Sequence, residues 1–149
     1  MDDSSPYRRT PTGSQLVFTP QLAVGLDEID VHHQHMVELF NRAITPGTGA
    51  VADLLEDIER YVGFHFTSEI LLMRTYGYPR VERHEKEHQG IWNLFIEKSD
   101  DCLRDPSRIV ELGRFFNQWL ISHSASSDLD VAHHIRARRQ RQSPSITPS

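Results

Sequence analysis

The segment spanning residues 65–88 constrains the fold of this chain more than any other. It contains His65 and Glu69 four residues apart, then a Gly-Tyr-Pro break, then His84 and His88 four residues apart. On a helix, residues four apart lie on one face, so each pair points its two side chains the same way. Glycine and proline in the break are typical of a helix stop followed by a helix start. The sequence therefore predicts two antiparallel helices that set two pairs of metal ligands against each other.

Apolar periodicity extends this pattern into an all-α, up-down-up-down four-helix bundle with the metal site in its core. Asp30 is predicted to cap the first helix, and Asp105-Pro106 to begin the fourth. Residues 15–29 are predicted to be an extended N-terminal segment lying across the core. The predicted division is 1–14 flexible arm, 15–135 bundle and 136–149 basic disordered tail. The predicted helices are about Val31–Ile44, Val51–Thr75 and Pro79–Leu103, with a fourth after Pro106.

Length and composition set the class of protein. At 149 residues, with 38% hydrophobic and 25% charged residues, the chain suits one soluble domain. No apolar run approaches the roughly 18 residues needed to span a bilayer, and the opening MDDSSPYRRT has no hydrophobic signal core. We therefore expect a cytoplasmic protein without membrane insertion. The single cysteine, Cys102, forms no internal disulfide and is expected to pack as a small apolar residue.

The last fourteen residues, 136–149, are basic, with four arginines and no acid. Such a tail can bind nucleic acid or anionic lipid. Four arginines among serine and proline are few for that purpose. We interpret the tail as a solvated end and expect no nucleic-acid partner.

Five of the nine histidines fall on predicted inner faces, with at least one on every helix. A buried imidazole needs partners for both ring nitrogens, and a lone buried carboxylate such as Glu69 must neutralise or find a cation. A metal ion meets these demands together. The serine-rich run after the last histidine predicts a loosened helix that lets Asp128 or Asp130 reach back. The five histidines are His33, His65, His84, His88 and His123.

Five imidazoles and two carboxylates exceed the four ligands of one zinc ion. They suit two six-coordinate ions that share the carboxylates and a solvent bridge, with one position left over. A histidine-rich set without thiolate favours iron, with manganese as the alternative.

The sequence resembles the hemerythrin family, specifically its single-domain bacterial members, over about residues 18–129. The resemblance rests on an aspartate three residues before His33, on HFTSE and HEKEH, and on WLISH followed five residues later by Asp128. It implies that seven ligand positions carry the expected residue types. These are His33, His65, Glu69, His84, His88, His123 and Asp128.

The resemblance also implies two iron ions (Fe²⁺/Fe³⁺), bridged by Glu69, Asp128 and a solvent oxo or hydroxo group. One iron is expected to be held by His84, His88 and His123. The other is expected to be held by His33 and His65, with one position open for O2. The family's pocket lining corresponds to Met36, Phe66, Trp119, Leu120 and Ser124.

Four positions depart from the family pattern, one of them Phe18, where relatives often have tryptophan. Ser124 replaces a branched aliphatic residue, and we expect its hydroxyl to admit or order water and so to speed autoxidation. His32 replaces a glutamine and Ile70 a second acid, both expected off the inner face with no loss of metal. The remaining histidines are expected to be surface residues: His32, His35, His133 and His134.

The resemblance favours reversible O2 binding, for carriage, storage, delivery or sensing. The alternative is a di-iron oxidoreductase acting on nitric oxide or peroxide, and a third reading is iron storage or a metal-dependent interaction module. Because no general acid or base stands out near the open position, hydrolysis is disfavoured. We expect no enzymatic function beyond weak oxidase or peroxidase activity. The expected partners are O2 and a protein that receives O2 or a signal, with the chain itself a monomer.

Overall fold

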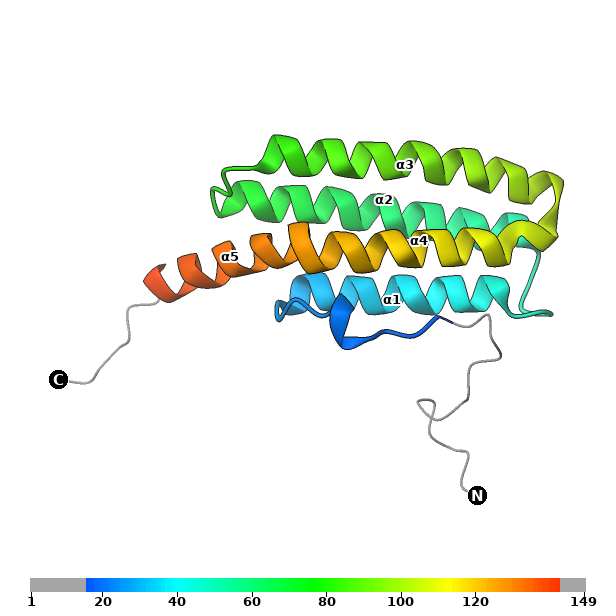
Figure 1. Ribbon diagram of the computed structural model, residues 1–149, viewed down its shortest axis with the longest axis horizontal. Coiled ribbons are helices and arrows are strands. Elements are labelled where there is room, and N and C mark those ends of the chain that lie inside the picture. The colour runs from blue at the N-terminus through cyan, green and yellow to red at the C-terminus, as the bar shows by residue number, and fades with distance from the viewer. Residues whose placement is uncertain (1–15, 143–149) are drawn as a thin grey trace, which may run out of the picture.

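Four long helices form an antiparallel bundle, and a fifth helix prolongs the fourth (Figure 1). The computed structural model describes residues 16–142, and the predicted arm of residues 1–14 lies outside them. Because residues 16–142 contain no strand, the predicted all-α four-helix bundle is confirmed. No helix in this range is long and apolar enough to cross a membrane. The elements are η1 (Pro20–Leu22), α1 (Asp27–Ile44), α2 (Val51–Thr75), α3 (Val81–Arg104), η2 (Pro106–Arg108), α4 (Ile109–His123), the π-helical turn η3 (Ser124–Asp128) and α5 (Leu129–Gln142).

The chain reversals around α3 follow from local sequence signals. Gly77 takes a left-handed φ of 64°, and the amide of Tyr78 donates to the carbonyl of Met73 at 2.9 Å, which closes α2. At the next reversal, Asp105 Oδ1 accepts from the amide of Ser107 at 3.2 Å. Both breaks lie where the sequence predicts them, and α2 has its predicted bounds.

The prediction that Asp30 caps the first helix is wrong. Helix α1 begins at Asp27, so Asp30 lies within its first turn. Its carboxylate instead accepts from the amides of Val24 (2.7 Å) and Gly25 (3.0 Å). Gly25 has a φ of 79°, and the loop turns there into the helix. The aspartate therefore fixes the loop before the helix instead of the helix end.

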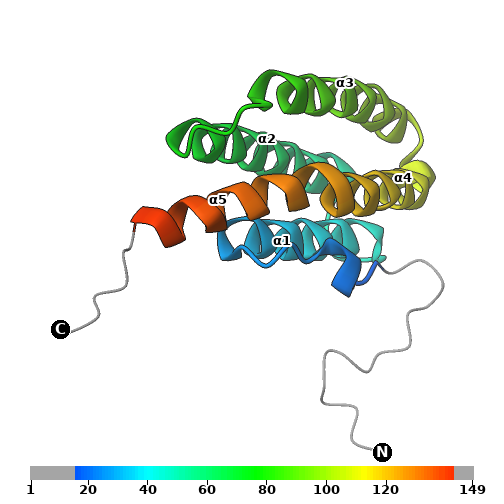
Figure 2. The ribbon, with the colours of Figure 1, turned by 60° about the vertical axis from the view of Figure 1, so that its left-hand side comes forward.

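Helix α5 extends further than the predicted domain boundary. The tail predicted to be disordered from residue 136 is helical as far as Gln142, and residues 143–149 lie outside the described range. Figure 2 shows α5 continuing the direction of α4 across the start of α1. Arg136 donates there to the carbonyls of Val24 (2.9 Å) and Gly25 (3.0 Å). Arg139 donates to the Tyr76 hydroxyl at 2.9 Å. These contacts hold the helix beyond its last buried residue, Ile135.

Two apolar cores occupy the bundle. The larger one includes Phe40, Phe95 and Phe116, and it is joined by the N-terminal segment through buried Leu16. The smaller one lies where α5 meets the loop before α1 and the turn after α2. On α1 and α2, and along the α4–η3–α5 segment, the predicted ligands fall between residues of the two cores. On α3 they fall between Val81, which packs against the smaller core, and Ile91 of the larger core. The smaller core consists of Val24, Leu26, Ile29, Met73, Tyr78, Val131, Ala132 and Ile135.

Candidate metal centre

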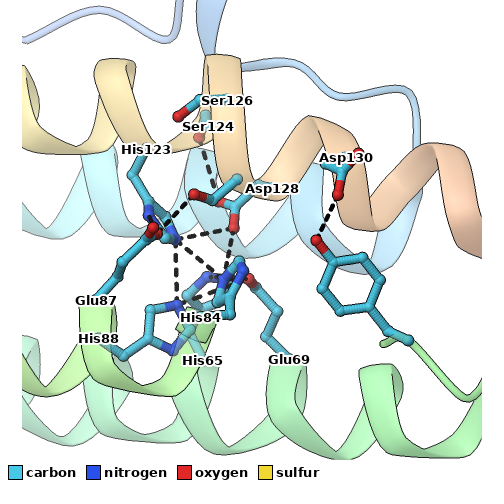
Figure 3. A network of polar contacts seen from close by, with 12 residues as sticks. His65, Glu69, His84, Glu87, His88, His123, Ser124, Ser126, Asp128 and Asp130 are labelled. Carbon is cyan, nitrogen blue, oxygen red and sulfur yellow. Dashed lines mark hydrogen bonds and ion pairs between the residues drawn. The ribbon is translucent and has the colours of Figure 1, made fainter. Parts of the chain in front are cut away.

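Seven buried side chains from α1, α2, α3, α4 and η3 converge between the two cores (Figure 3). They form two groups of candidate ligand atoms, each group within 4.8 Å, and Glu69 and Asp128 belong to both. All seven are at most 6% exposed. One group adds His84, His88 and His123 to the two carboxylates, and the other adds His33 and His65. The structure thus brings together all seven residues predicted as ligands, and their ligand roles stay a prediction.

The carboxylate of Glu69 faces both groups, one oxygen to each. Oε1 lies 2.5 Å from His84 Nε2 and 3.6 Å from His88 Nε2. Oε2 lies 3.0 Å from His65 Nε2. Because His65 and Glu69 are one helical turn apart on α2, the helix itself fixes this pairing.

The carboxylate of Asp128 repeats this arrangement from the opposite side. Oδ1 lies 3.1 Å from His84 Nε2 and 3.0 Å from His123 Nε2, while Oδ2 lies 3.2 Å from His33 Nε2. In an α-helix, five residues' separation would turn Asp128 away from His123. The π-helical turn η3 widens the helix and brings both side chains inward. The loosening predicted from the serine-rich run is therefore confirmed, and Asp128 is the aspartate that reaches back.

All five histidines present Nε2 to the centre. His88 and His84 each lie within 3.2 Å of His123, Nε2 to Nε2, and the same atoms of His33 and His65 lie 3.2 Å apart. Two neutral imidazoles cannot both donate along such a contact, and lone pairs facing each other repel. A shared cation is the arrangement that satisfies these lone pairs together.

The outer nitrogens of three histidines have partners that hold the rings. His123 Nδ1 lies 3.1 Å from Glu87 Oε2, which also accepts from the Ser127 hydroxyl at 2.6 Å. Trp119 stacks on the same imidazole, with ring centroids 4.4 Å apart. Partners of this kind fix the tautomer and orientation of a metal-binding histidine.

The outer nitrogens of the other two partnered rings lie on the two-histidine side. His33 Nδ1 lies 3.0 Å from Ser124 Oγ and 3.4 Å from the Leu22 carbonyl oxygen. His65 Nδ1 lies 3.0 Å from His32 Nδ1. The expectation that His32 is a surface residue is therefore wrong, because its half-buried ring contacts a predicted ligand. His134 is also half-buried, and its Nε2 lies 2.8 Å from the Tyr76 carbonyl oxygen, whereas His35 and His133 are exposed.

The electrostatics of the cluster fit a cation. Burial and the nearby Asp128 carboxylate raise the pKa of Glu69 to about 7. Burial lowers the pKa of His88 to about 2, and nearby His84 and His123 add to that shift. Burial also opposes charge on His84, yet the adjacent Asp128 and Glu69 carboxylates outweigh burial and raise its pKa to about 9. Two carboxylates buried this deeply need positive charge beside them, which a protonated His84 or a metal ion supplies.

Unpartnered buried atoms support the same reading. Both oxygens of Glu69 and Oδ1 of Asp128 are buried without a hydrogen-bond partner in the described part of the chain. Buried polar atoms are rarely left so, because each costs about 1–3 kcal/mol. The donor set consists of imidazole and carboxylate without thiolate. It therefore fits two metal ions that share the two carboxylates.

The five residues predicted to line a pocket do not share one environment. Met36 and Leu120 belong to the larger core. Phe66 stacks on His88 with centroids 4.0 Å apart, as Trp119 does on His123. The hydroxyl of Ser124 faces the outer nitrogen of His33. The pocket role of these residues stays a prediction.

Two residues beside the centre were missed by the sequence reasoning: Glu87 and, in its contact with His65, His32. Glu87 lies one residue before His88 and outside the apolar stripe. Its side chain is one-third exposed. The one available signal was the i, i+3 spacing from His84, which is common on any helix.

Three cavities approach the centre from outside. One of about 240 Å³ lies between α1 and α2, is lined by Ile29, Phe64 and Leu72, and reaches His65 and Glu69. A second, of about 380 Å³ between α2 and α3, reaches His88. A polar one of about 390 Å³ reaches His84 and is lined by Arg80, Arg83, Ser126 and Ser127. Candidate ligands of both halves of the cluster thus line cavities.

Comparison with known proteins points to one family. The Hemerythrin HHE cation binding domain matches residues 24–135. A bacteriohemerythrin of Stenotrophomonas maltophilia is 26% identical over 126 residues, covering 82% of each chain. A bacteriohemerythrin of Pseudomonas aeruginosa is 29% identical over 131 residues, covering 83% of each chain. Hemerythrin subunit 2 of Golfingia vulgaris is 27% identical over 118 residues, covering 79% of this chain and 91% of the relative.

Proposed function

The chain belongs to the hemerythrin family, and from that premise we propose that it binds O2 reversibly at a carboxylate-bridged pair of non-haem iron ions. One observation carries the proposal. Glu69 and Asp128 each direct one oxygen to the three-histidine group and the other to the two-histidine group. A bridging ligand must present its two oxygens in this way.

The unequal groups give the two irons different roles. With two irons bound, three imidazoles, two carboxylate oxygens and a solvent bridge would complete six-coordination on the side of His84, His88 and His123. On the side of His33 and His65 the same count would leave one position for a small molecule. When bound, ferrous ions at such a site supply the electrons that hold O2.

The side chains around the centre exclude water from it and orient the imidazoles. Phe66 and Trp119 cover the imidazoles of His88 and His123 on the three-histidine side. Met36 and Leu120, also predicted to line the O2 pocket, are 1% and 2% exposed. A dry apolar pocket keeps water and protons away from bound O2, so that O2 dissociates as O2 and not as peroxide. Binding without release of product supports a carrier, a store, a delivery protein or a sensor. The partners in this proposal are O2 and a protein that receives O2 or a signal from a monomeric chain.

The alternative is a di-iron oxidoreductase acting on nitric oxide or peroxide. The polar cavity that reaches His84 favours it, because Ser126, Ser127 and two arginines there can hold water close to the centre. Turnover of peroxide or nitric oxide needs proton supply, whereas reversible O2 binding needs water excluded.

The deciding experiment is anaerobic loading with ferrous iron, followed by metal analysis and an optical spectrum on admission of air. We expect two irons per chain and a charge-transfer band that disappears under vacuum and returns with air. Irreversible bleaching with peroxide release would favour the oxidoreductase. Glu69→Gln should lose iron, while Glu59→Gln, at an exposed position on the same helix, should behave as the parent does.

A further inference from the structure

Ser124 occupies a position that links two of the candidate ligands. It is the first residue of η3, follows His123 directly, and is 0% exposed. Its Oγ lies 3.0 Å from Nδ1 of His33, a residue on α1, and 3.5 Å from Oδ2 of Asp128. Figure 3 shows Ser124 beside Asp128 on the π-helical turn.

The direction of these contacts follows from the tautomer of His33. Its Nε2 faces the centre, 3.2 Å from Asp128 Oδ2, so a metal-binding His33 carries its proton on Nδ1. Nδ1 then donates to Ser124 Oγ, and the serine hydroxyl proton is left to donate to Asp128 Oδ2. The Leu22 carbonyl oxygen, at 3.4 Å, is the longer second acceptor for the same Nδ1 proton.

The partner of His123 on the other side of the centre is of a different kind. Its Nδ1 faces the carboxylate of Glu87, a charged acceptor. A carboxylate makes the attached imidazole a stronger donor to metal than a neutral hydroxyl does. The two metal positions thus differ in the hydrogen-bond partners of their histidines as well as in the number of histidines.

Resting on the proposed function, we propose that Ser124 is a positioning residue for the two-histidine iron, through hydrogen bonds that tie His33 to the bridging Asp128. The Ser124 hydroxyl fixes the orientation of the His33 imidazole relative to the Asp128 carboxylate. The two-histidine iron is then the one whose retention depends on Ser124, and the three-histidine iron is held independently of it.

The test compares Ser124→Ala with the matched pair Ser124→Thr and Ser124→Val, which have nearly equal volume and differ in the hydroxyl. Each protein is loaded anaerobically with ferrous ⁵⁷Fe, and iron transfer to a chelator is followed with Mössbauer spectra of the two sites. We expect the Ser124→Ala and Ser124→Val proteins to release one iron about 10–100-fold faster than the parent. One of the two components of their Mössbauer spectra should also shift. Thr should restore the parent rate.

Two controls keep the outcomes distinct. Ser122→Ala alters an exposed serine on α4 and should release iron at the parent rate. Thermal unfolding of the metal-free variants reports any folding defect separately. Equal release by Thr and Val, or equal acceleration of both irons, would overturn the proposal. A parent protein that binds fewer than two irons would instead overturn the proposed function.

Discussion

The two apolar cores on either side of the candidate centre are built by different means. In the larger core the rings of Phe40, Phe95 and Phe116 contact one another, with centroids 4.9–6.3 Å apart. In the smaller core most side chains are aliphatic, and polar contacts do much of the joining. Tyr78 donates to Asp130 at 2.5 Å, and Arg136 ties α5 to the loop before α1.

The difference between the two cores shows how this bundle accommodates a charged cluster. The larger core buries enough apolar surface to hold four helices by itself. The smaller core joins α5, the turn after α2 and the first turn of α1, and the cluster separates it from the rest. We therefore expect its stability to depend on whether the carboxylates are compensated by metal.

The largest loss of stability should come from a substitution in the larger core. Phe116→Ala removes a ring that is 1% exposed and should destabilise the protein by about 3–5 kcal/mol, with iron or without it. Denaturant unfolding of both forms measures this. A loss confined to the iron-loaded form would show that the larger core is not self-sufficient.

Removal of iron should come next. At free iron about 100–1,000 times the dissociation constant, binding stabilises the folded state by about 2.7–4.1 kcal/mol. We expect chelation to accelerate amide exchange in Val131–Ile135 more than around Phe95 and Phe116, because Glu69 and Asp128 then repel each other beside the smaller core. Uniform acceleration along the chain would refute a separate role for the smaller core.

A matched pair of smaller substitutions sharpens the comparison. Ile58→Val and Ile135→Val each remove one methylene from a buried isoleucine, one in each core, and should each cost about 0.5–1.5 kcal/mol. The cost at Ile58 should appear in global unfolding. In metal-free protein, the cost at Ile135 should appear as local opening of α5, measured by hydrogen exchange. Identical exchange patterns for the two variants would contradict this prediction.

The sequence predicted the parts of the fold that local chemistry determines. Helical spacing of apolar residues predicted the bundle, and Gly77 and Asp105 predicted two of its reversals. The serine-rich run predicted a loosened helix, which the structure shows as a π-helical turn. The ligand cluster could be predicted from the sequence for the same reason. His65 and Glu69, like His84 and His88, are local pairs whose direction a helix alone dictates.

The features that the sequence did not predict depend on residues far apart in the chain. Asp30 has the residue type of a helix cap, but its partners lie in a loop that Arg136 fixes from α5. The length of α5 depends on similar long-range contacts, because its own apolar stripe ends at Ile135. Likewise, His32 and Ser124 show their contacts with ligands only once α1, α2 and η3 are packed together.

The smallest effect should come from the surface pair at the edge of the smaller core. Arg139 forms an ion pair with Glu28 and donates to the Tyr76 hydroxyl at 2.9 Å. At pH 7, Arg139→Gln should cost about 0.2–1 kcal/mol, as exposed pairs do. Arg141→Gln is the matched control, since the Arg141 side chain donates to the carbonyl oxygen of Ala137 in its own helix.

The pH dependence of that cost tests its origin. The hydrogen bond from Arg139 holds the pKa of Glu28 below its ordinary value of 4.5. A carboxylate whose pKa is lowered by folding stabilises the fold above the ordinary value, and the contribution is lost as pH falls through the lowered pKa. The difference in unfolding free energy between the parent and Arg139→Gln should therefore be constant near neutral pH and shrink below about pH 4.5. In a Glu28→Gln background the dependence should disappear. A cost that stays unchanged as the pH falls would mean that Arg139 acts through Tyr76 alone, and that the edge of the smaller core is held without the ion pair.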